Sequence, residues 1–213
     1  MKRELKPELL DSLPPDHPDA RHNRRDLRLT NLAMGNYRWF SRTLPDMVRP
    51  RDRVLEIGAG TGELGGHLAG RNIAVDGLDL WPAPAGRHSD QSWHRADLLS
   101  FGGYGRYAVI IGNLIFHQFT ASQLGELGGK LRRSARIIVA CEPLRRRSSQ
   151  LLFAAIAPLL GANQVSLHDA HVSVAAGFRG NELPEMLGLR QPEWNWSCHH
   201  TLLGAYRMVA RRV

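Results

Sequence analysis

A short run of alternating glycines carries the strongest chemical signal in this chain of 213 residues. An apolar run, residues 53–57, leads directly into Gly58, Gly60 and Gly62, and Glu56 stands two positions before the first of them. Glycines at the end of a strand let the backbone bend sharply and approach a ligand closely, while the following helix start offers free amide groups. The pattern predicts that a small molecule lies across this turn.

A second acid favours a binding role for the turn over a purely structural one. Asp79 closes the next apolar run, where a carboxylate can accept hydrogen bonds from both hydroxyls of a ribose. A dinucleotide site requires the spacing GxGxxG, and the phosphate loop of nucleotide hydrolases requires a Lys-Ser or Lys-Thr pair after the glycines. This chain has GxGxG and lacks that pair, which disfavours both kinds of site.

With two later segments added, the chain resembles the class I S-adenosylmethionine-dependent methyltransferases. The resemblance covers about residues 53–213 and implies S-adenosylmethionine as cofactor and methyl transfer as reaction. The segments that carry it are Glu56-x-Gly58-x-Gly60-x-Gly62, Asp79, Ala96-Asp97-Leu98 and Gly112-Asn113-Leu114-Ile115-Phe116-His117.

The resemblance also implies where the cofactor's sugar and amino acid bind. The glycine turn would pass beneath both parts, and Glu56 would orient that turn or receive the methionine ammonium. Asp79 would hold the ribose hydroxyls, and Asn113 would lie near the methionine portion. The residues implied for this half of the site are Glu56, Gly58, Ala59, Gly60, Gly62, Asp79 and Asn113.

The adenine ring is assigned to a second group of residues on the same grounds. Leu80, with Trp81 as a further candidate, would pack on one face of the ring, Leu98 would pack on the other, and Asp97 would accept from the exocyclic amine. Apolar walls with one acceptor suit a neutral flat ring. The alternative is that Asp97 is an ordinary acidic residue in a surface turn and contacts no ligand.

Histidines supply the candidates for proton removal. A sulfonium methyl is already activated, so a methyltransferase aligns the acceptor, excludes water and, for a hydroxyl, removes a proton. His117 follows the Asn113 segment, and His168 and His171 lie in residues 161–176, which we expect to be irregular. A histidine with a pKa near 6.5 suits a base, although all three can equally serve in packing or in polar loops. We expect no metal site, because no carboxylate cluster accompanies these histidines.

The expected acceptor is a small molecule. Amine methylation is usually associated with Asn/Asp-Pro-Pro-Tyr, whereas this chain has Asn113-Leu114-Ile115-Phe116, which disfavours it. A weaker similarity to small methyltransferases of polyketide and quinone pathways implies an oxygen of a phenol, enol or carboxyl group, with carbon as an alternative. Aromatic residues near the N-terminus and an apolar helix at 151–160 could form a lid over such a substrate, or plain core. An inactive regulatory protein with the same cofactor turn is a less favoured interpretation.

The charge balance raises an alternative partner, RNA or protein. The net charge is +8, but of the 28 basic residues only Lys2, Lys6 and Lys130 are lysines. A skew toward arginine more often reflects an Arg-rich codon usage than a binding surface, and the basic residues are scattered rather than clustered. This disfavours nucleic acid as a partner. The candidate contacts for this alternative are Arg145-Arg146-Arg147 and Arg132-Arg133.

The elements that would position these residues read as an α/β fold. Short apolar runs alternate with helical stretches, which predicts a doubly wound, mostly parallel seven-stranded sheet of Rossmann-like type with an antiparallel last strand. The last two strands, 192–198 and 201–211, form a hairpin joined by His199 and His200. The other expected strands are 53–57, 74–78, 92–96, 108–111 and 137–141, and the expected helices are 63–71, 121–133 with Thr120 as cap, 145–160 and 180–187.

Residues 1–48 read as a helical extension or lid in front of a methyltransferase domain at 49–213. A helix capped by Asp16 or Asp19 would bury an apolar stripe, and Gly35 would end it before a second short helix. That stripe comprises Leu27, Leu29, Leu32, Ala33 and Met34.

Composition and chain length limit the number of domains and the class of protein. With 43% hydrophobic and 23% charged residues, the chain reads as one globular unit. It has no apolar run long enough for a membrane span and no export signal, so we expect a cytoplasmic protein. Cys141 and Cys198 lack a CxxC pairing and are expected to be inert packing residues. The sequence does not define an oligomeric state.

Overall fold

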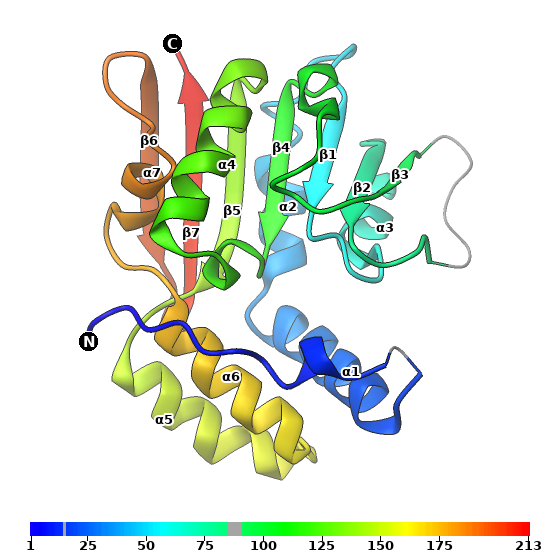
Figure 1. Ribbon diagram of the computed structural model, residues 1–213, viewed down its shortest axis with the longest axis vertical. Helices are drawn as coiled ribbons and strands as arrows, with labels where there is room; N and C mark the ends of the chain where they lie inside the picture. Colours follow the sequence, from blue (N-terminus) through cyan, green and yellow to red (C-terminus); the bar gives the residue numbers. More distant parts are fainter. Residues whose placement is uncertain (15, 85–90) are drawn as a thin grey trace.

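Seven strands form one sheet in the order β3-β2-β1-β4-β5-β7-β6 (Figure 1). The computed structural model describes residues 1–14, 16–84 and 91–213. All neighbouring pairs are parallel except those of β7, which runs antiparallel to both β5 and β6. The predicted sheet, with its antiparallel last strand, is therefore confirmed. The strands are β1 Val54–Ile57, β2 Val75–Asp79, β3 Trp93–Arg95, β4 Val109–Asn113, β5 Ile137–Pro143, β6 Trp194–His200 and β7 Ala205–Arg212.

The order of the strands reverses between β1 and β4. β1 pairs with β2 on one side and with β4 on the other, so the chain first builds outward to β3 and then returns to build toward β6. In open parallel sheets, ligands bind at the carboxyl ends of the strands beside such a reversal. The glycine turn begins where β1 ends, at this position.

Helices cover both faces because successive strand residues point to opposite sides. α2 Asn36–Thr43 and α3 Glu63–Ala69 cover one face, and α4 Ala121–Ser134 and α7 Glu182–Met186 cover the other (Figure 1). Leu55 and Ile57 pack into the core under α4, whereas Val54 packs into the core under α2 and α3. The predicted Thr120 cap of α4 is confirmed as a capping box with Gln123.

A third group of helices lies beyond the carboxyl ends of the parallel strands. It consists of α1 Pro18–Ala33, α5 Arg147–Ile156 and α6 Gln164–Ala176, and the N-terminal segment, residues 1–13, runs across it (Figure 1). Short 3-10 turns complete the fold: η1 Leu10–Ser12, η2 Gly103–Arg106, η3 Phe116–Gln118 and η4 Ala157–Leu160. None of the described helices is long and apolar enough to cross a membrane.

The N-terminal helix α1 buries a different face from the one predicted. Leu27, Leu29 and Leu32 are exposed, and the buried residues of α1 are Ala20, Asn23, Asp26 and Asn31. The prediction was wrong because polar partners on α6 and β4 compensate for the burial of these polar side chains. The cap also differs: the side chain of His17, and not that of Asp16 or Asp19, accepts a bond from the Asp19 amide.

Residues 161–176 were expected to be irregular, but they contain helix α6. The prediction was wrong. Asn163 caps this helix by accepting a bond from the Ser166 amide. Its buried face mixes Ser166 and Asp169 with Val172 and Ala176, so no apolar stripe marks it in the sequence.

The hairpin join was also misplaced. His199 and His200 belong to β6, and residues 201–204 make the turn, with Gly204 at a φ of +88°.

Candidate functional site

The glycine turn has the left-handed backbone that its sequence predicts. Gly58, Gly60 and Gly62 have φ values of +65°, +54° and +73°. The amides of Gly58 and Ala59 both donate to the carbonyl of Leu78, at 2.8 and 3.2 Å, which ties the turn to the end of β2. A Cβ at Gly60 would meet nothing within 4 Å, whereas one at Gly58 would lie 2.4 Å from the side chain of Ile115. The turn is therefore packed at its first glycine and open at its second.

Replacing Gly58 with alanine should destabilise the protein by about 1–3 kcal/mol, because it adds a clash to a strained backbone. The matched control is Gly66→Ala in α3, where a Cβ meets nothing within 4 Å and the substitution should stabilise by about 0.5–1 kcal/mol. Urea unfolding of both variants measures the two effects. Equal stability of the two variants would contradict the expectation.

Asp79 joins the glycine turn to β2. Its Oδ2 accepts a hydrogen bond from the Gly60 amide at 2.8 Å, and its Oδ1 accepts one from the Trp81 amide at 2.9 Å. A carboxylate has about four acceptor positions. The same two oxygens can therefore hold the turn and still accept from the hydroxyls of a sugar.

The residues expected to surround an adenine lie at the ends of β2 and β3. Leu98 is buried and Leu80 is 60% exposed. Asp97 uses Oδ1 to accept from the amides of Leu99 and Ser100, at 2.8 and 3.0 Å, so it also has the turn role considered as its alternative. The Arg24 guanidinium of α1 lies 5.6 Å from the centre of the Trp81 ring, which brings α1 close to the end of β2.

Glu56 is buried beside two other acids. Burial raises the pKa of Glu56 to about 8; a hydrogen bond from the Gly65 backbone opposes this shift, and the charges of Asp79 and Glu63 add to it. Glu63 itself accepts from the Tyr37 hydroxyl at 3.0 Å and from Arg28 at 3.2 Å. Two carboxylates, Asp79 and Glu63, thus lie near a third that burial keeps protonated at neutral pH.

Glu56→Gln should gain stability relative to the natural protein as the pH rises. The unfolded glutamate ionises near its ordinary pKa of 4.5, whereas folded Glu56 keeps its proton to about pH 8. Because the folded state then binds more protons than the unfolded state, the natural protein loses stability between these values. We expect the difference in unfolding free energy to shift by roughly 2–4 kcal/mol in favour of the variant between pH 5 and 8. Urea titrations at several pH values test this, and a difference that is flat with pH would contradict it.

Three asparagines join the N-terminal helices to the end of β4. Asn31 Oδ1 accepts from Asn113 Nδ2 at 3.0 Å and from Asn36 Nδ2 at 2.9 Å. Asn113 was expected near the cofactor's methionine, but Asn31 and Asn36 were not predicted. The unusual burial of polar residues in α1 is apparent only once its partners are known.

His117 lies in a buried chain of charges that the sequence did not reveal. Its Nδ1 lies 2.7 Å from Glu142 Oε2 and its Nε2 lies 3.2 Å from Glu8 Oε1. Burial alone would lower the pKa of His117, but its bonds to Glu142 and Glu8 outweigh it and raise the pKa to about 10. Glu142 also accepts from the amides of residues 115–117 and so holds the η3 turn. Just before this turn, Leu114 adopts a φ of +59°, a strained value of the kind that clusters at functional sites.

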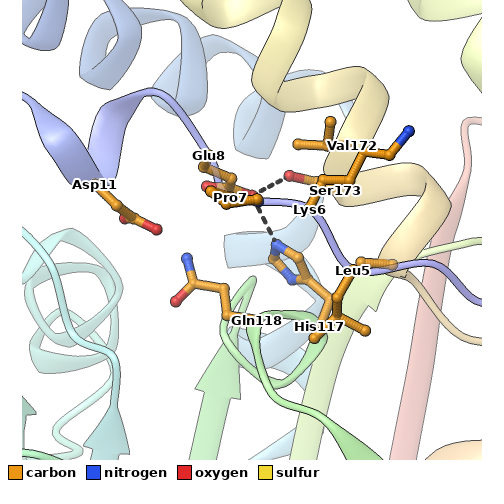
Figure 2. A pocket seen from close by; sticks show the side chains of 10 residues that line it. Leu5, Lys6, Pro7, Glu8, Asp11, His117, Gln118, Val172 and Ser173 are labelled. Carbon is orange, nitrogen blue, oxygen red and sulfur yellow. Dashed lines mark hydrogen bonds and ion pairs between the residues drawn. The ribbon is translucent and has the colours of Figure 1, made fainter.

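A cavity of about 290 Å³ lies between the N-terminal segment, η3 and α6 (Figure 2). Glu8, Asp11, His117, Gln118 and Ser173 line its polar side. Burial and the charges of Glu8 and Asp169 raise the pKa of Asp11 to about 6. Lys6 also lines the cavity, so two acids, Glu8 and Asp11, face two basic groups, Lys6 and His117.

His168 and His171 do not join His117 in this cavity. Both are exposed on α6: His168 lies 3.1 Å from Asp169, and His171 lines a smaller cavity between α5 and α6. Asp169 between them is buried and accepts from the amides of Leu9 and Leu10 at 2.7 and 3.1 Å. The predicted His-Asp-x-His group thus anchors the N-terminal segment through its aspartate.

The arginine runs considered for a polyanionic partner are partly occupied inside the protein. Arg145 is buried, and its guanidinium bonds both carboxylate oxygens of Glu182 and the carbonyl of Gly177. Arg132 donates to the Leu187 carbonyl. These two side chains hold α7 and the segment before it, so they are not available as phosphate contacts.

The charges around the glycine turn fit a cationic nucleoside better than a pyrophosphate. Glu63 and Asp79 supply negative charge, and the carbonyl oxygens of Asn36 and Asn113 are buried without a hydrogen-bond partner among the described residues. S-adenosylmethionine brings a sulfonium, an ammonium and a ribose, which match these groups. Across residues 1–14, 16–84 and 91–213, no group of three or more His, Cys, Asp or Glu is placed to hold a metal ion.

The fold has counterparts among solved methyltransferase structures. The plantazolicin methyltransferase BamL, in complex with a triazolic desmethylPZN analogue and S-adenosylhomocysteine (SAH), aligns with a TM-score of 0.71 at 12% identity, over 95% of this chain and 92% of that one. Magnesium protoporphyrin IX methyltransferase from Synechocystis PCC 6803 with bound SAH aligns with a TM-score of 0.58 at 15% identity, over 89% of this chain and 86% of that one. No protein-family model and no curated protein matches the sequence. The chain therefore has the methyltransferase fold, and at these identities the likeness shows the fold alone.

Proposed function

We propose that this protein is an S-adenosylmethionine-dependent methyltransferase acting on a small molecule. The observation that carries the proposal is the glycine turn at the reversal of strand order, with Asp79 bonded to the amide of Gly60. Solved structures of the same fold hold SAH. In our proposal, residues 49–213 bind the cofactor and residues 1–48 cover the site.

Each part of the site has a task in this reaction. When bound, the cofactor supplies a methyl group that is already activated for transfer. Asp79 holds the ribose, Leu98 and Asp97 receive the adenine, and Glu56, which keeps its proton at neutral pH, orients the glycine turn. Glu63 adds negative charge that favours a cationic ligand. The N-terminal helices and α6 exclude water from the reacting atoms, and alignment of the acceptor then supplies much of the rate.

We propose an oxygen of a phenol, enol or carboxyl group in a polyketide- or quinone-like compound as the acceptor. The two solved neighbours act on plantazolicin and on magnesium protoporphyrin IX by name, which supports a small molecule for this chain as well. The cavity of about 290 Å³ beside η3 has room for part of such a compound.

A phenolic or enolic acceptor loses a proton, and the three histidine candidates differ in their capacity to take it. With a pKa near 10, His117 is already protonated at neutral pH, so its role here is to hold the η3 turn and donate hydrogen bonds. His168 and His171 are exposed on α6. Neither lines the cavity beside η3, so we propose either of them as base only for an acceptor that extends from this cavity along α6.

Calorimetry with SAH tests the cofactor assignment directly. We expect one site per chain with micromolar affinity, and an absence of binding would end the proposal. Incubation of the protein with labelled S-adenosylmethionine and a panel of phenols, enols and carboxylic acids then tests the acceptor. Transfer to tRNA or to a protein, but to no small molecule, would support the alternative instead.

A further inference from the structure

Helix α5 and the η4 turn that follows it present an apolar face to solvent. No residue of α5 is buried. Four large apolar side chains of the two elements are exposed: Leu151, Leu152, Ile156 and Leu159, with exposed fractions of 72, 40, 43 and 84%. Residues 151–160 were considered as a lid or as core, but these four side chains are not buried and do not line the cavity beside η3.

The opposite face of α5 packs on α6. Gln150, Phe153 and Ala154 border the small cavity between the two helices, and Gln150 Nε2 donates to the His171 carbonyl at 3.1 Å. Figure 1 shows α5 at the lower edge of the molecule. A helix that is apolar on both faces is normally buried, and a contiguous apolar patch left exposed marks an interaction site.

The amino end of α5 is basic, although neither helix capping nor the helix dipole requires it. Arg146 is the N-cap residue, but its side chain makes no capping bond, and Arg147 is the first helical residue, where the dipole disfavours positive charge. Both are exposed, and neither forms an ion pair in the part of the chain that the structure describes. The single acid within residues 144–176 is Asp169, which is buried and bonded to the N-terminal segment. This end of the apolar face therefore carries an excess of positive charge.

The other end of the face, beyond η4, is balanced by charges from α1. A Cβ at Gly161 would lie 3.7 Å from the Arg25 guanidinium, and Asp19 Oδ1 accepts from Asn163 at 3.2 Å. One charge of each sign lies there, so the positive excess belongs to Arg146 and Arg147.

The small size of the face and its charge favour a lipid surface over a protein partner. A helix of 10 residues is only about 15 Å long and about 10 Å wide, whereas a stable protein interface buries roughly 800 Å² on each partner. Attachment to a membrane surface requires less: a few apolar side chains at the headgroup level and basic residues that attract anionic lipids. Because α5 is far shorter than the hydrocarbon core of about 30 Å, it would lie in the plane of the surface.

We propose that the apolar face of α5 and η4, together with Arg146 and Arg147, docks on an anionic membrane surface. Leu151 and Leu159, the two most exposed of the four apolar side chains, enter the headgroup region, and the two guanidinium groups contact lipid phosphates. The inference does not depend on the proposed function, because this surface includes no residue of the glycine turn or of the cavity beside η3.

Sedimentation with lipid vesicles tests the docking surface. Vesicles of phosphatidylcholine alone are compared with vesicles of equal parts phosphatidylcholine and phosphatidylglycerol. The natural protein should bind the anionic vesicles at least about 10-fold more tightly, because two arginines face the headgroups. This preference should shrink as added salt screens the charges.

Three variants separate the apolar contribution from the charge. Leu159→Glu should weaken binding to the anionic vesicles at least about 10-fold, because it removes an inserted side chain and adds a repelled charge. Val213→Glu makes the same change in charge at an 81% exposed residue at the other end of the molecule (Figure 1), and as the matched control it should bind like the natural protein. Arg146→Gln combined with Arg147→Gln should reduce the preference for anionic vesicles to less than about threefold. Thermal melting without lipid checks that all variants are folded.

Sedimentation equilibrium without lipid tests a second copy of the chain as the occupant. A natural protein that is dimeric, together with a monomeric Leu159→Glu, would assign the face to self-association and overturn the membrane proposal. The proposal also fails if the natural protein binds neither kind of vesicle, or if Leu159→Glu and Val213→Glu bind the anionic vesicles equally well.

Discussion

Replacing Asp79 with alanine should weaken the binding of SAH at least about 100-fold, because we propose that Asp79 accepts two charge-assisted hydrogen bonds from the ribose. The same change removes the acceptor that holds the Gly60 and Trp81 amides. The glycine turn would then lose its anchor on β2 and its shape for the ligand. Calorimetry with SAH measures the effect.

Two companion variants separate the ribose contact from general damage. Asp79→Asn keeps one acceptor oxygen and the side-chain shape, so we expect an intermediate loss, roughly 10-fold. Glu126→Ala removes an exposed acid of α4 and should leave the affinity unchanged. If Asp79→Ala folds and binds SAH like the natural protein, the assignment of Asp79 to the ribose is wrong.

The glycine turn could be predicted from sequence because its determinants are local. Gly58, Gly60 and Gly62 take left-handed φ values that other residues rarely adopt, and an apolar strand directly precedes them. The strands themselves were predictable because both faces of a doubly wound sheet are buried, which leaves apolar runs in the sequence. Their ends shifted by a few residues, as at the hairpin, where His199 and His200 lie inside β6.

The covering helices could not be predicted in the same detail because their buried faces are polar. Asp26 of α1 bonds Ser166 of α6, and Asn23 bonds Asp169, so the inward residues look like surface residues until their partners are known. The leucines Leu27, Leu29 and Leu32 predicted that the opposite face of α1 is buried, but all three are exposed. Hydrogen-bonded pairs whose members are more than a hundred residues apart produce no hydrophobic periodicity in either segment of the sequence.

Glu142 did leave one signal, an acid inside an otherwise apolar strand. All seven residues of β5 are buried, and a buried carboxylate requires partners. Sequence alone could not name His117, Glu8 and the η3 amides as those partners. The consequence for His117 is large, because its assignment as a base came from its position after Asn113, whereas its behaviour follows from its two carboxylate neighbours.

Glu142→Ala is expected to destabilise the protein by about 3–5 kcal/mol, the usual cost of removing one partner of a buried ion pair. The carboxylate is fully buried and accepts from three backbone amides and from His117 Nδ1. Its loss leaves these donors unpaired at the turn that packs on Gly58. Glu142→Gln keeps one oxygen for the amides and should cost less. Urea unfolding of both variants measures the effects.

The pH dependence of the stability lost in Glu142→Ala tests whether that stability comes from the charge on His117. A histidine whose pKa rises from 6.5 to about 10 on folding contributes stability that is fully present below pH 6.5 and is lost as the pH rises through 10. The difference in unfolding free energy between the natural protein and Glu142→Ala should therefore be largest near pH 6 and should shrink toward pH 10. Glu8→Gln removes the weaker of the two carboxylate bonds, at 3.2 Å, and should show the same trend with a smaller amplitude. A loss that is constant with pH would mean that Glu142 acts only through the backbone amides, and that His117 is neutral and available as a base.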